Sequence, residues 1–173
     1  MVNPTNVFPP GRPKGKCDPS GGSEAHAMAS VGATFQWSLR VYWEDTDAGG
    51  IVFYANYLKF FERSRTEWLR SLGIEQHALR EQTGGMFIVS ETSVRYLQPS
   101  RLDDELIVTA KLQERGRASL IIKQQVFLKN KPTAESPTTL LCEATIRIGW
   151  VDASSLKPSR IPTHILDSLE LHS

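Results

Sequence analysis

The sequence has little of what marks several common protein classes. Only two of its 173 residues are cysteines, Cys17 and Cys142, and neither has a CxxC or Cys/His spacing, which excludes a disulfide scaffold and a zinc finger. No apolar run approaches the ~20 residues of a transmembrane helix. The 20 Lys and Arg nearly cancel the 19 Asp and Glu, so the concentrated basic surface of a nucleic-acid binder is also missing. We expect a reduced, cytoplasmic protein that neither spans a membrane nor binds nucleic acid.

Fixed structure is predicted to begin at residue 35. Residues 1–34 hold five of the ten prolines and five of the twelve glycines, with few apolar residues and no periodicity. Such a segment cannot bury enough surface to offset the entropy of ordering it. It also lacks the continuous apolar stretch of a secretory signal. The sequence therefore predicts a disordered tail over 1–34 and a single domain over 35–173.

The periodicity of the apolar residues predicts one strand, one long helix and four more strands. A period of two indicates a first strand whose buried face carries Phe35, Trp37, Leu39, Val41 and Trp43. Spacings of three, four and seven then predict a helix over 54–72, ended by Gly73. Four further alternating runs are predicted as strands: 86–97, 105–114, 119–129 and 139–151. Two short helices are expected, at 74–81 and, loosely packed, at 162–171.

The order of these elements predicts the fold class. Strands and helices do not alternate in a βαβ rhythm, so the sheet should be mostly antiparallel and the fold α+β. The aromatic first half of the long helix indicates that it is buried against one face of the five-stranded sheet. Cys142 alternates with Leu140 and Ala144 and is therefore expected in the core.

Residues suited to catalysis lie between the first predicted strand and the long helix. Asp47 is followed by Gly49 and Gly50 and then by the expected helix start near Tyr54. Glycines let the backbone approach a ligand, and the first turn of a helix offers unpaired N–H groups and a positive dipole end. A carboxylate beside such donors can act as base or nucleophile toward a polarised carbonyl. This pairing indicates acyl transfer.

Other interpretations of the same segment stay open. Asp45, Thr46 and Asp47 could simply cap a turn or the helix. A calcium loop would use Asp45, Asp47 and Gly50, but Asn56 stands where the bidentate Glu is required. A histidine-based site would have to draw on residues that have no partner at a readable spacing: His26, His77, His164 and His172.

The absence of a placed histidine favours one kind of substrate. An amide or alkoxide leaving group needs an acid to protonate it, whereas a thiolate, with a thiol pKa near ~8.5, leaves largely unaided. One carboxylate with an oxyanion site is therefore better matched to a thioester than to a peptide.

The segment 40–57, Arg-Val-Tyr-Trp-Glu-Asp-Thr-Asp-Ala-Gly-Gly-Ile-Val-Phe-Tyr-Ala-Asn-Tyr, resembles the signature of hotdog-fold acyl-CoA thioesterases. The resemblance is closest to the Tol–Pal-associated (YbgC-type) branch and its 4-hydroxybenzoyl-CoA thioesterase relatives, and Tyr54 is shared with the latter. It continues through residues 60–67, 96–104, 150–152 and 157–158, and so spans roughly residues 36–165. It implies an α+β hotdog fold, a long helix wrapped by a curved five-stranded antiparallel sheet.

The resemblance also implies an activity and a set of site residues. Asp47 matches the catalytic carboxylate and the backbone N–H of Tyr54 matches the oxyanion donor, with no cofactor and no metal. Substrate contacts are expected from Gly49, Gly50, Ile51 and Val52, and in the 115–119 hairpin region from Arg117 and Ser119. The implied partner is an acyl-CoA, the implied assembly a homodimer or homotetramer. The alternative is a non-catalytic hotdog module that binds acyl-CoA or acyl carrier protein.

Overall fold

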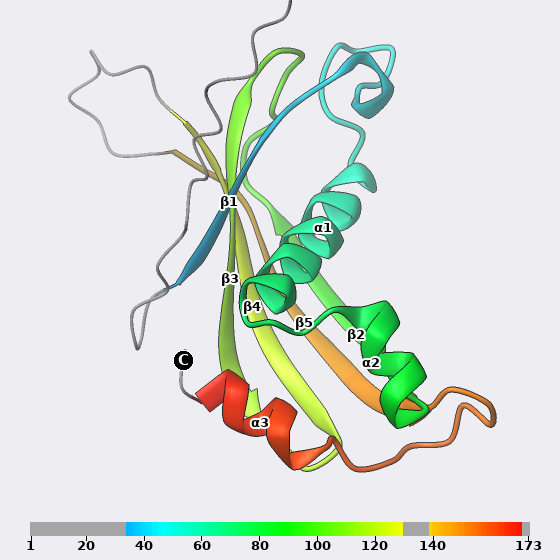
Figure 1. Cartoon of the computed structure of the whole chain (residues 1–173). Coiled ribbons are helices and arrows are strands. Elements are labelled where there is room, and N and C mark those ends of the chain that lie inside the picture. Colours follow the sequence, from blue (N-terminus) through cyan, green and yellow to red (C-terminus); the bar gives the residue numbers. More distant parts are fainter. Residues whose placement is uncertain (1–33, 130–138, 171–173) are drawn as a thin grey trace, which may run out of the picture.

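The structure, a computed structural model, describes residues 34–129 and 139–170 (Figure 1). The predicted tail therefore lies, apart from Thr34, outside the described residues, and the division between tail and domain stays a prediction. The described chain contains five strands, one 3-10 turn and three α-helices. Their bounds are β1 Phe35–Arg40, η1 Trp43–Asp45, α1 Asn56–Ser71, α2 Gln76–Thr83, β2 Gly85–Tyr96, β3 Glu105–Arg115, β4 Ser119–Leu128, β5 Thr139–Asp152 and α3 Thr163–Glu170.

The five strands form one sheet in the order β1-β3-β4-β5-β2, and all neighbouring pairs are antiparallel. The sheet curves around α1, which crosses one of its faces (Figure 1). The β3–β4 connection is a tight hairpin in which the Gly116 N–H donates to the Ser119 carbonyl. The predicted α+β hotdog architecture is confirmed. The strand order puts β1 and β2 at the two edges of the sheet.

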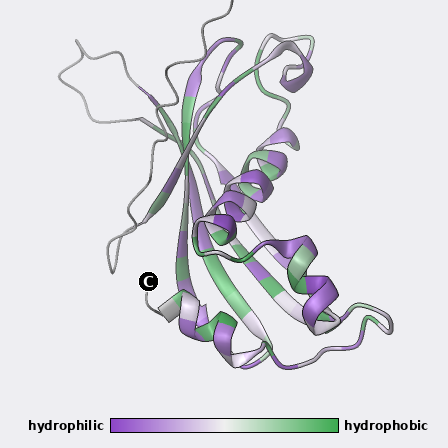
Figure 2. Cartoon of the chain, in the orientation of Figure 1, coloured by the Kyte–Doolittle hydropathy of each residue, from purple (hydrophilic) through white to green (hydrophobic). Residues whose placement is uncertain are grey.

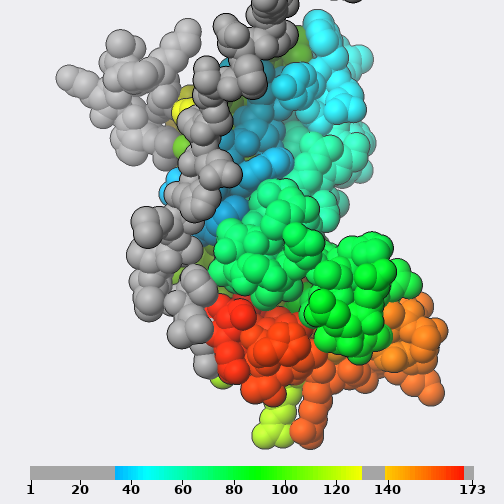
Figure 3. Space-filling view, viewed as in Figure 1, coloured from blue at the N-terminus to red at the C-terminus, as the bar shows by residue number. Residues whose placement is uncertain are grey.

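The core lies between α1 and the concave face of the sheet. Alternate residues of β3 and β5 face inward, and hydrophilic and hydrophobic residues alternate along the strands in Figure 2. Cys142 is fully buried, as predicted. Helix α1 contributes residues spaced three and four apart: Tyr57, Phe60, Phe61, Ser64, Arg65, Trp68 and Leu69. In Figure 3 the end of α1, α2 and α3 lie side by side on this face of the molecule.

One layer of this interface is polar. Arg65 of α1 donates to the Gln124 Oε1 of β4 at 2.8 Å, and Gln124 Nε2 donates to the carbonyls of Phe61 and Thr109. The Ser64 hydroxyl donates to the Val108 carbonyl. Burial lowers the pKa of Arg65, although nearby Glu62 raises it. These bonds fix the height of α1 above the sheet, since a shift would leave buried groups unpaired.

Three expectations need correction. The first strand ends at Arg40 and Trp43 is 79% exposed, because the backbone turns into η1 instead of extending the strand. Helix α1 begins at Asn56, so Tyr54 precedes it and is exposed. Helix α3 is not loosely packed: Ile165 and Leu169 are fully buried.

The start of β2 is held in register by a close contact. A Cβ on Gly85 would lie 2.3 Å from the Trp150 ring of β5, so no other residue fits there without displacing the indole. Trp150 also packs edge-on against Phe87, with ring centroids 4.8 Å apart. Glycine is therefore required here by the approach of a neighbouring side chain.

Candidate active site

Asp47 lies in a short loop that folds back on itself between η1 and α1. Its N–H donates to the Ile51 carbonyl at 2.9 Å, and its carbonyl accepts from Gly50. Thr46 and Val52 form an isolated antiparallel bridge that closes the loop. Gly50 has a φ of 72°, in the left-handed region, which explains the glycine at this position.

The Asp47 side chain is exposed and only partly engaged. Its Oδ1 accepts from the Gly49 N–H at 2.8 Å. A Cβ on Gly49 would lie 3.1 Å from this oxygen, so a side chain there would crowd the carboxylate. The local backbone conformation thus explains why Gly49 and Gly50 are glycines. Their contact with substrate stays a prediction. The arrangement leaves the carboxylate with a fixed direction and free acceptor capacity.

The loop is attached to the start of α1 through Asn56, the helix's first residue. This buried side chain donates through Nδ2 to the carbonyl of Asp45 at 2.9 Å and, at 3.5 Å, to that of Glu44. The Phe53 N–H also donates to the Asp45 carbonyl. Three hydrogen bonds therefore hold the segment just before Asp47 against the amino end of the helix.

The backbone N–H of Tyr54 is left without a protein acceptor among the described residues. Its neighbour Phe53 is paired on both sides, because the Phe53 N–H donates to Asp45 and its carbonyl accepts from Asn56 at 2.8 Å. The free N–H therefore belongs to a peptide unit whose other end is fixed. It stands at the positive end of the α1 dipole, where an anion or developing oxyanion is stabilised.

Exposed aromatic and apolar side chains surround this helix end. Tyr54 packs on Phe53 with ring centroids 4.6 Å apart and edge-on to Tyr96 at 6.3 Å. The large apolar side chains exposed in this part of the chain are Tyr42, Trp43, Phe53, Tyr54, Leu58, Tyr96 and Leu97. An apolar surface of this kind beside polar donors fits a binding site better than a bare solvent face.

Sequence reasoning missed three residues that build this end of the molecule. Asn56 was considered only as a failed calcium ligand, although an amide side chain at a helix start is itself a signal of loop attachment. Tyr96 Oη donates to the Tyr54 carbonyl at 3.0 Å. The Ser100 hydroxyl lies 2.9 Å from Tyr57 Oη, and the Ser100 carbonyl accepts from Val52. These contacts join segments more than forty residues apart, so no local pattern could reveal them.

Arg117 and Ser119 do not lie near Asp47 within the chain. Arg40, just before the Asp47 loop, pairs with Glu105 at one end of β3, whereas the hairpin follows Arg115 at its other end. Ten residue steps of strand correspond to roughly 30 Å. The Arg117 carbonyl instead accepts from Ile161, which holds the segment before α3. Their predicted contact with CoA stays a prediction.

Three cavities of the described chain lie away from the Asp47 loop. One of about 360 Å³ lies over β2–β5 beside Ser93 and Lys123, and one of about 330 Å³ lies between α1, α2 and α3. A third, of about 110 Å³, lies between α1 and β2 beside Arg65 and Val89. Neither Asp47 nor Tyr54 lines any of these three cavities, and both side chains are exposed.

The structure also bears on the other interpretations of the loop: a cap, a calcium site and a histidine-based site. Asp45 Oδ2 accepts from the Tyr42 N–H at 3.0 Å, a capping role within η1. Within 34–129 and 139–170, no group of three or more His, Cys, Asp or Glu could hold a metal ion. His77 is exposed beside Glu81 on α2, and His164 is exposed on α3. Across the same residues, no helix is both long and apolar enough to span a bilayer.

Comparison with known proteins gives a consistent result. Residues 41–169 match the model of the Thioesterase-like superfamily. The chain is 37% identical over 131 residues to "Acyl-CoA thioesterase YbgC" of Haemophilus influenzae, a match that covers 76% of this chain and 90% of that protein. It is 38% identical over 132 residues to "Acyl-CoA thioester hydrolase YbgC" of Escherichia coli, covering 76% and 92%.

A solved structure agrees with the sequence matches. The probable thioesterase from Bartonella henselae superposes with a TM-score of 0.68 at 27% identity, covering 75% of this chain and all of that one. The match to the family model runs from the first residue after β1 to near the end of α3 and so includes the Asp47 loop and the start of α1. The chain therefore belongs to the Thioesterase-like superfamily and has its hotdog fold.

Proposed function

We propose that this protein hydrolyses acyl-CoA thioesters, with Asp47 and the Tyr54 N–H acting on the same carbonyl group. The observation that carries the proposal is the Tyr54 amide, which has no acceptor among the described residues and stands at a helix end to which the Asp47 loop is bonded. The names of the YbgC relatives support the reaction class. The exposed aromatic side chains around the helix end supply an apolar surface for the acyl or pantetheine part.

In the proposed reaction the thioester oxygen binds at the start of α1. The Tyr54 N–H and the helix dipole stabilise the negative charge that develops on this oxygen. Asp47 either removes a proton from water as the water oxygen bonds to the carbonyl carbon, or attacks that carbon itself to give a mixed anhydride that water cleaves. In both routes the carbon–sulfur bond breaks, and the CoA thiolate leaves and takes up a proton.

The proposal is tested by thiol release from acyl-CoAs of graded chain length and one aryl-CoA. Wild-type protein should release free thiol, and Asp47→Asn should lower turnover by ~100-fold or more. The amide oxygen can still accept the Gly49 N–H, so the fold should not change. Binding without thiol release would support the alternative of a non-catalytic module, and unchanged turnover in Asp47→Asn would remove Asp47 from the mechanism.

A single turnover in oxygen-18 water separates the two routes. Label that appears first in the Asp47 carboxylate supports nucleophilic attack, because water then cleaves an anhydride that includes this group. Label found only in the released acid, with an unlabelled protein, excludes an anhydride that water opens at the Asp47 carboxyl carbon.

We also propose that the site is completed by a second copy of the chain, in at least a homodimer. Strand β2 is an edge of the sheet, and Ile88 and Val89 expose apolar side chains on it. Antiparallel pairing of two β2 edges would bring the hairpin end of one chain toward the helix-start end of the other. Arg117 and Ser119 of the second copy would then approach the Asp47 loop, which they do not reach within one chain.

Sedimentation at several concentrations tests the assembly. Val89→Lys should shift the protein toward monomer and reduce thiol release in parallel, because a charge on an edge strand opposes edge-to-edge pairing. A fully active monomer would contradict the shared site. A cytoplasmic location, a link to the Tol–Pal system and acyl carrier protein as a partner stay predictions.

A further inference from the structure

The end of β2 meets the start of α1 through one side-chain hydrogen bond. Tyr96, the last residue of β2, donates from its hydroxyl to the Tyr54 carbonyl at 3.0 Å. Tyr54 thus has its carbonyl bonded by a side chain, and its N–H has no acceptor in the part of the chain that the structure describes. The preceding peptide unit is held separately, since the Phe53 carbonyl accepts from Asn56. The two peptide planes that meet at the Tyr54 Cα are therefore both fixed.

Tyr96 itself is held in place by aromatic neighbours. Its ring packs edge-on against Tyr54 and at 65° to Tyr57, with the Tyr57 centroid 5.6 Å away. Tyr57 is in turn bonded through its hydroxyl to Ser100. Burial, followed by the nearby Cys142, raises the pKa of Tyr96. The hydroxyl therefore stays protonated and able to donate at neutral pH.

We propose that Tyr96 is a positioning residue for the oxyanion donor: by holding the Tyr54 carbonyl, it keeps the Tyr54 N–H directed outward in the orientation that binds the developing charge. This inference rests on the proposed thioesterase function and adds a residue to its site. Tyr96 acts through Tyr54 and bonds the peptide backbone. Donors fixed in advance stabilise a transition state more than donors that must first reorient.

The contact predicts a specific kinetic signature. Tyr96→Phe keeps the ring and its packing but removes the hydroxyl. We expect kcat to fall roughly five- to tenfold, the effect of one neutral hydrogen bond on a transition state, with KM within about twofold of wild type. The matched control is Ser71→Ala, which removes a hydroxyl that donates to the Trp68 carbonyl at the carboxyl end of α1 and should leave kcat unchanged.

The sequence allows the same contact to be observed without turnover. Tyr54–Ala55 is the only Tyr-Ala pair in the chain and Phe53–Tyr54 the only Phe-Tyr pair. Carbonyl-¹³C tyrosine with ¹⁵N alanine therefore isolates the Tyr54 carbonyl, and carbonyl-¹³C phenylalanine with ¹⁵N tyrosine isolates the Tyr54 N–H. In Tyr96→Phe the carbonyl resonance should move upfield, and the amide resonance should shift or broaden.

The outcomes separate this inference from the function on which it rests. A wild-type protein that releases no thiol would overturn the proposed function and the role of Tyr96 with it. An active wild type with an equally active Tyr96→Phe variant would overturn the role of Tyr96 alone. Unchanged resonances in the variant would do the same, because they would show that the hydroxyl does not hold the peptide.

Discussion

The two ends of α1 differ in how their backbone groups are hydrogen-bonded. At the carboxyl end the last carbonyls have partners: Leu69 accepts from Leu72 and Ile74, Arg70 accepts from Gly73, and Trp68 accepts from the Ser71 hydroxyl. At the amino end the Tyr54 N–H has no acceptor within residues 34–129 and 139–170. A fold that closes one end of a buried helix and leaves the other open puts stability and chemistry in different places.

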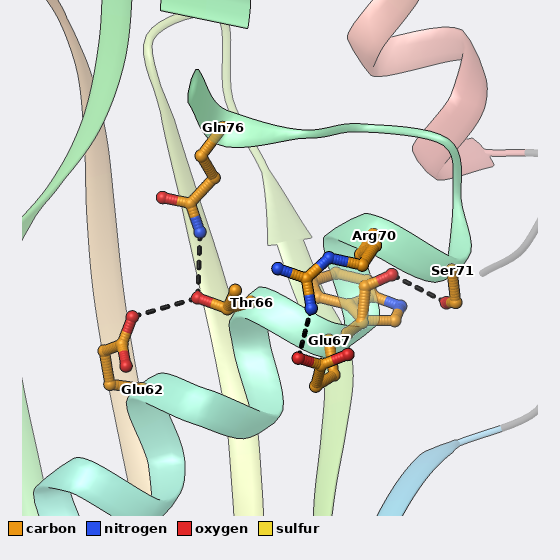
Figure 4. Close-up of polar contacts among 7 residues, drawn as sticks. Glu62, Thr66, Glu67, Arg70, Ser71 and Gln76 are labelled. Carbon is orange, nitrogen blue, oxygen red and sulfur yellow. Dashed lines mark hydrogen bonds and ion pairs between the residues drawn. The ribbon is translucent and has the colours of Figure 1, made fainter. Parts of the chain in front are cut away.

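The carboxyl end is also tied to the next helix (Figure 4). Gln76 of α2 donates to the Thr66 hydroxyl at 2.9 Å, and that hydroxyl donates to Glu62. Arg70 and Glu67 form an ion pair one turn apart on the same helix. Changes at this end should therefore alter the free energy of unfolding, and changes at the amino end should alter turnover.

The largest expected effect is on stability, at the closed end. Leu69→Ala should lower the free energy of unfolding by about 3 kcal/mol, because it leaves a cavity where a buried side chain packed. Chemical denaturation measures this change, and kcat of the folded fraction should match wild type. A loss of kcat at full stability would mean that the two ends are not separable.

The next effect is on turnover, at the open end. Replacing the Tyr54 amide by an ester, through incorporation of the α-hydroxy analogue of tyrosine, removes the N–H and weakens the Phe53 carbonyl as the acceptor for Asn56. We expect kcat to fall by about 100-fold, which corresponds to about 2.7 kcal/mol. The melting temperature should fall only slightly, because the N–H has no acceptor in the described part of the chain and the ester carbonyl of Phe53 still accepts, more weakly, from Asn56. Full activity of the ester protein would exclude the Tyr54 N–H as the oxyanion donor.

A smaller effect is expected where the chain leaves α1. Gly73 has a φ of 75°, and an added Cβ would meet no atom within 4 Å, so Gly73→Ala introduces only backbone strain. The cost should be about 1 kcal/mol. Thermal unfolding measures it, with thiol release as the control. An unchanged melting temperature would show that this turn relaxes into another conformation without cost.

The smallest effect is expected at the surface contact between α1 and α2. Gln76→Ala removes the exposed bond to Thr66 and should cost about 0.5 kcal/mol. Denaturant midpoints measured side by side with wild type can resolve this difference. A cost near that of Leu69→Ala would mean that α2 holds the helix end more strongly than its exposed contacts indicate.

The alternation of apolar residues was enough to predict most of the fold. In β3, Leu106, Val108 and Ala110 face the core as expected, because one buried face dictates a period of two. The same rule failed at Trp43, since a nearby carboxylate, Asp45, accepts the Tyr42 N–H and turns the chain before it can add another strand residue. Local hydrogen bonding outweighed the burial of one side chain.

In the candidate site, too, the local contacts could be predicted from the sequence and the long-range contacts could not. Asp47 and the helix start follow each other closely in sequence, so the loop between them could be recognised from local chemistry. The contacts of Tyr96 with Tyr54 and of Gln124 with Arg65 join residues 42 and 59 positions apart, and they depend on strand order, which no periodicity encodes. Arg117 was assigned from the resemblance, and its distance from the loop follows from the length of β3.

The missing side chain of Gly85 has a consequence for the far end of its strand. A shift of β2 by one residue would put the Met86 side chain where Gly85 now lies, and it would collide with the Trp150 indole. This contact therefore opposes such a shift against β5. Tyr96 is the last residue of β2, eleven positions further on and beyond the register shift between Val89 and Glu91. The position of the Tyr96 hydroxyl therefore depends on two features of β2: the close contact of Gly85 with the indole and the register shift between Val89 and Glu91.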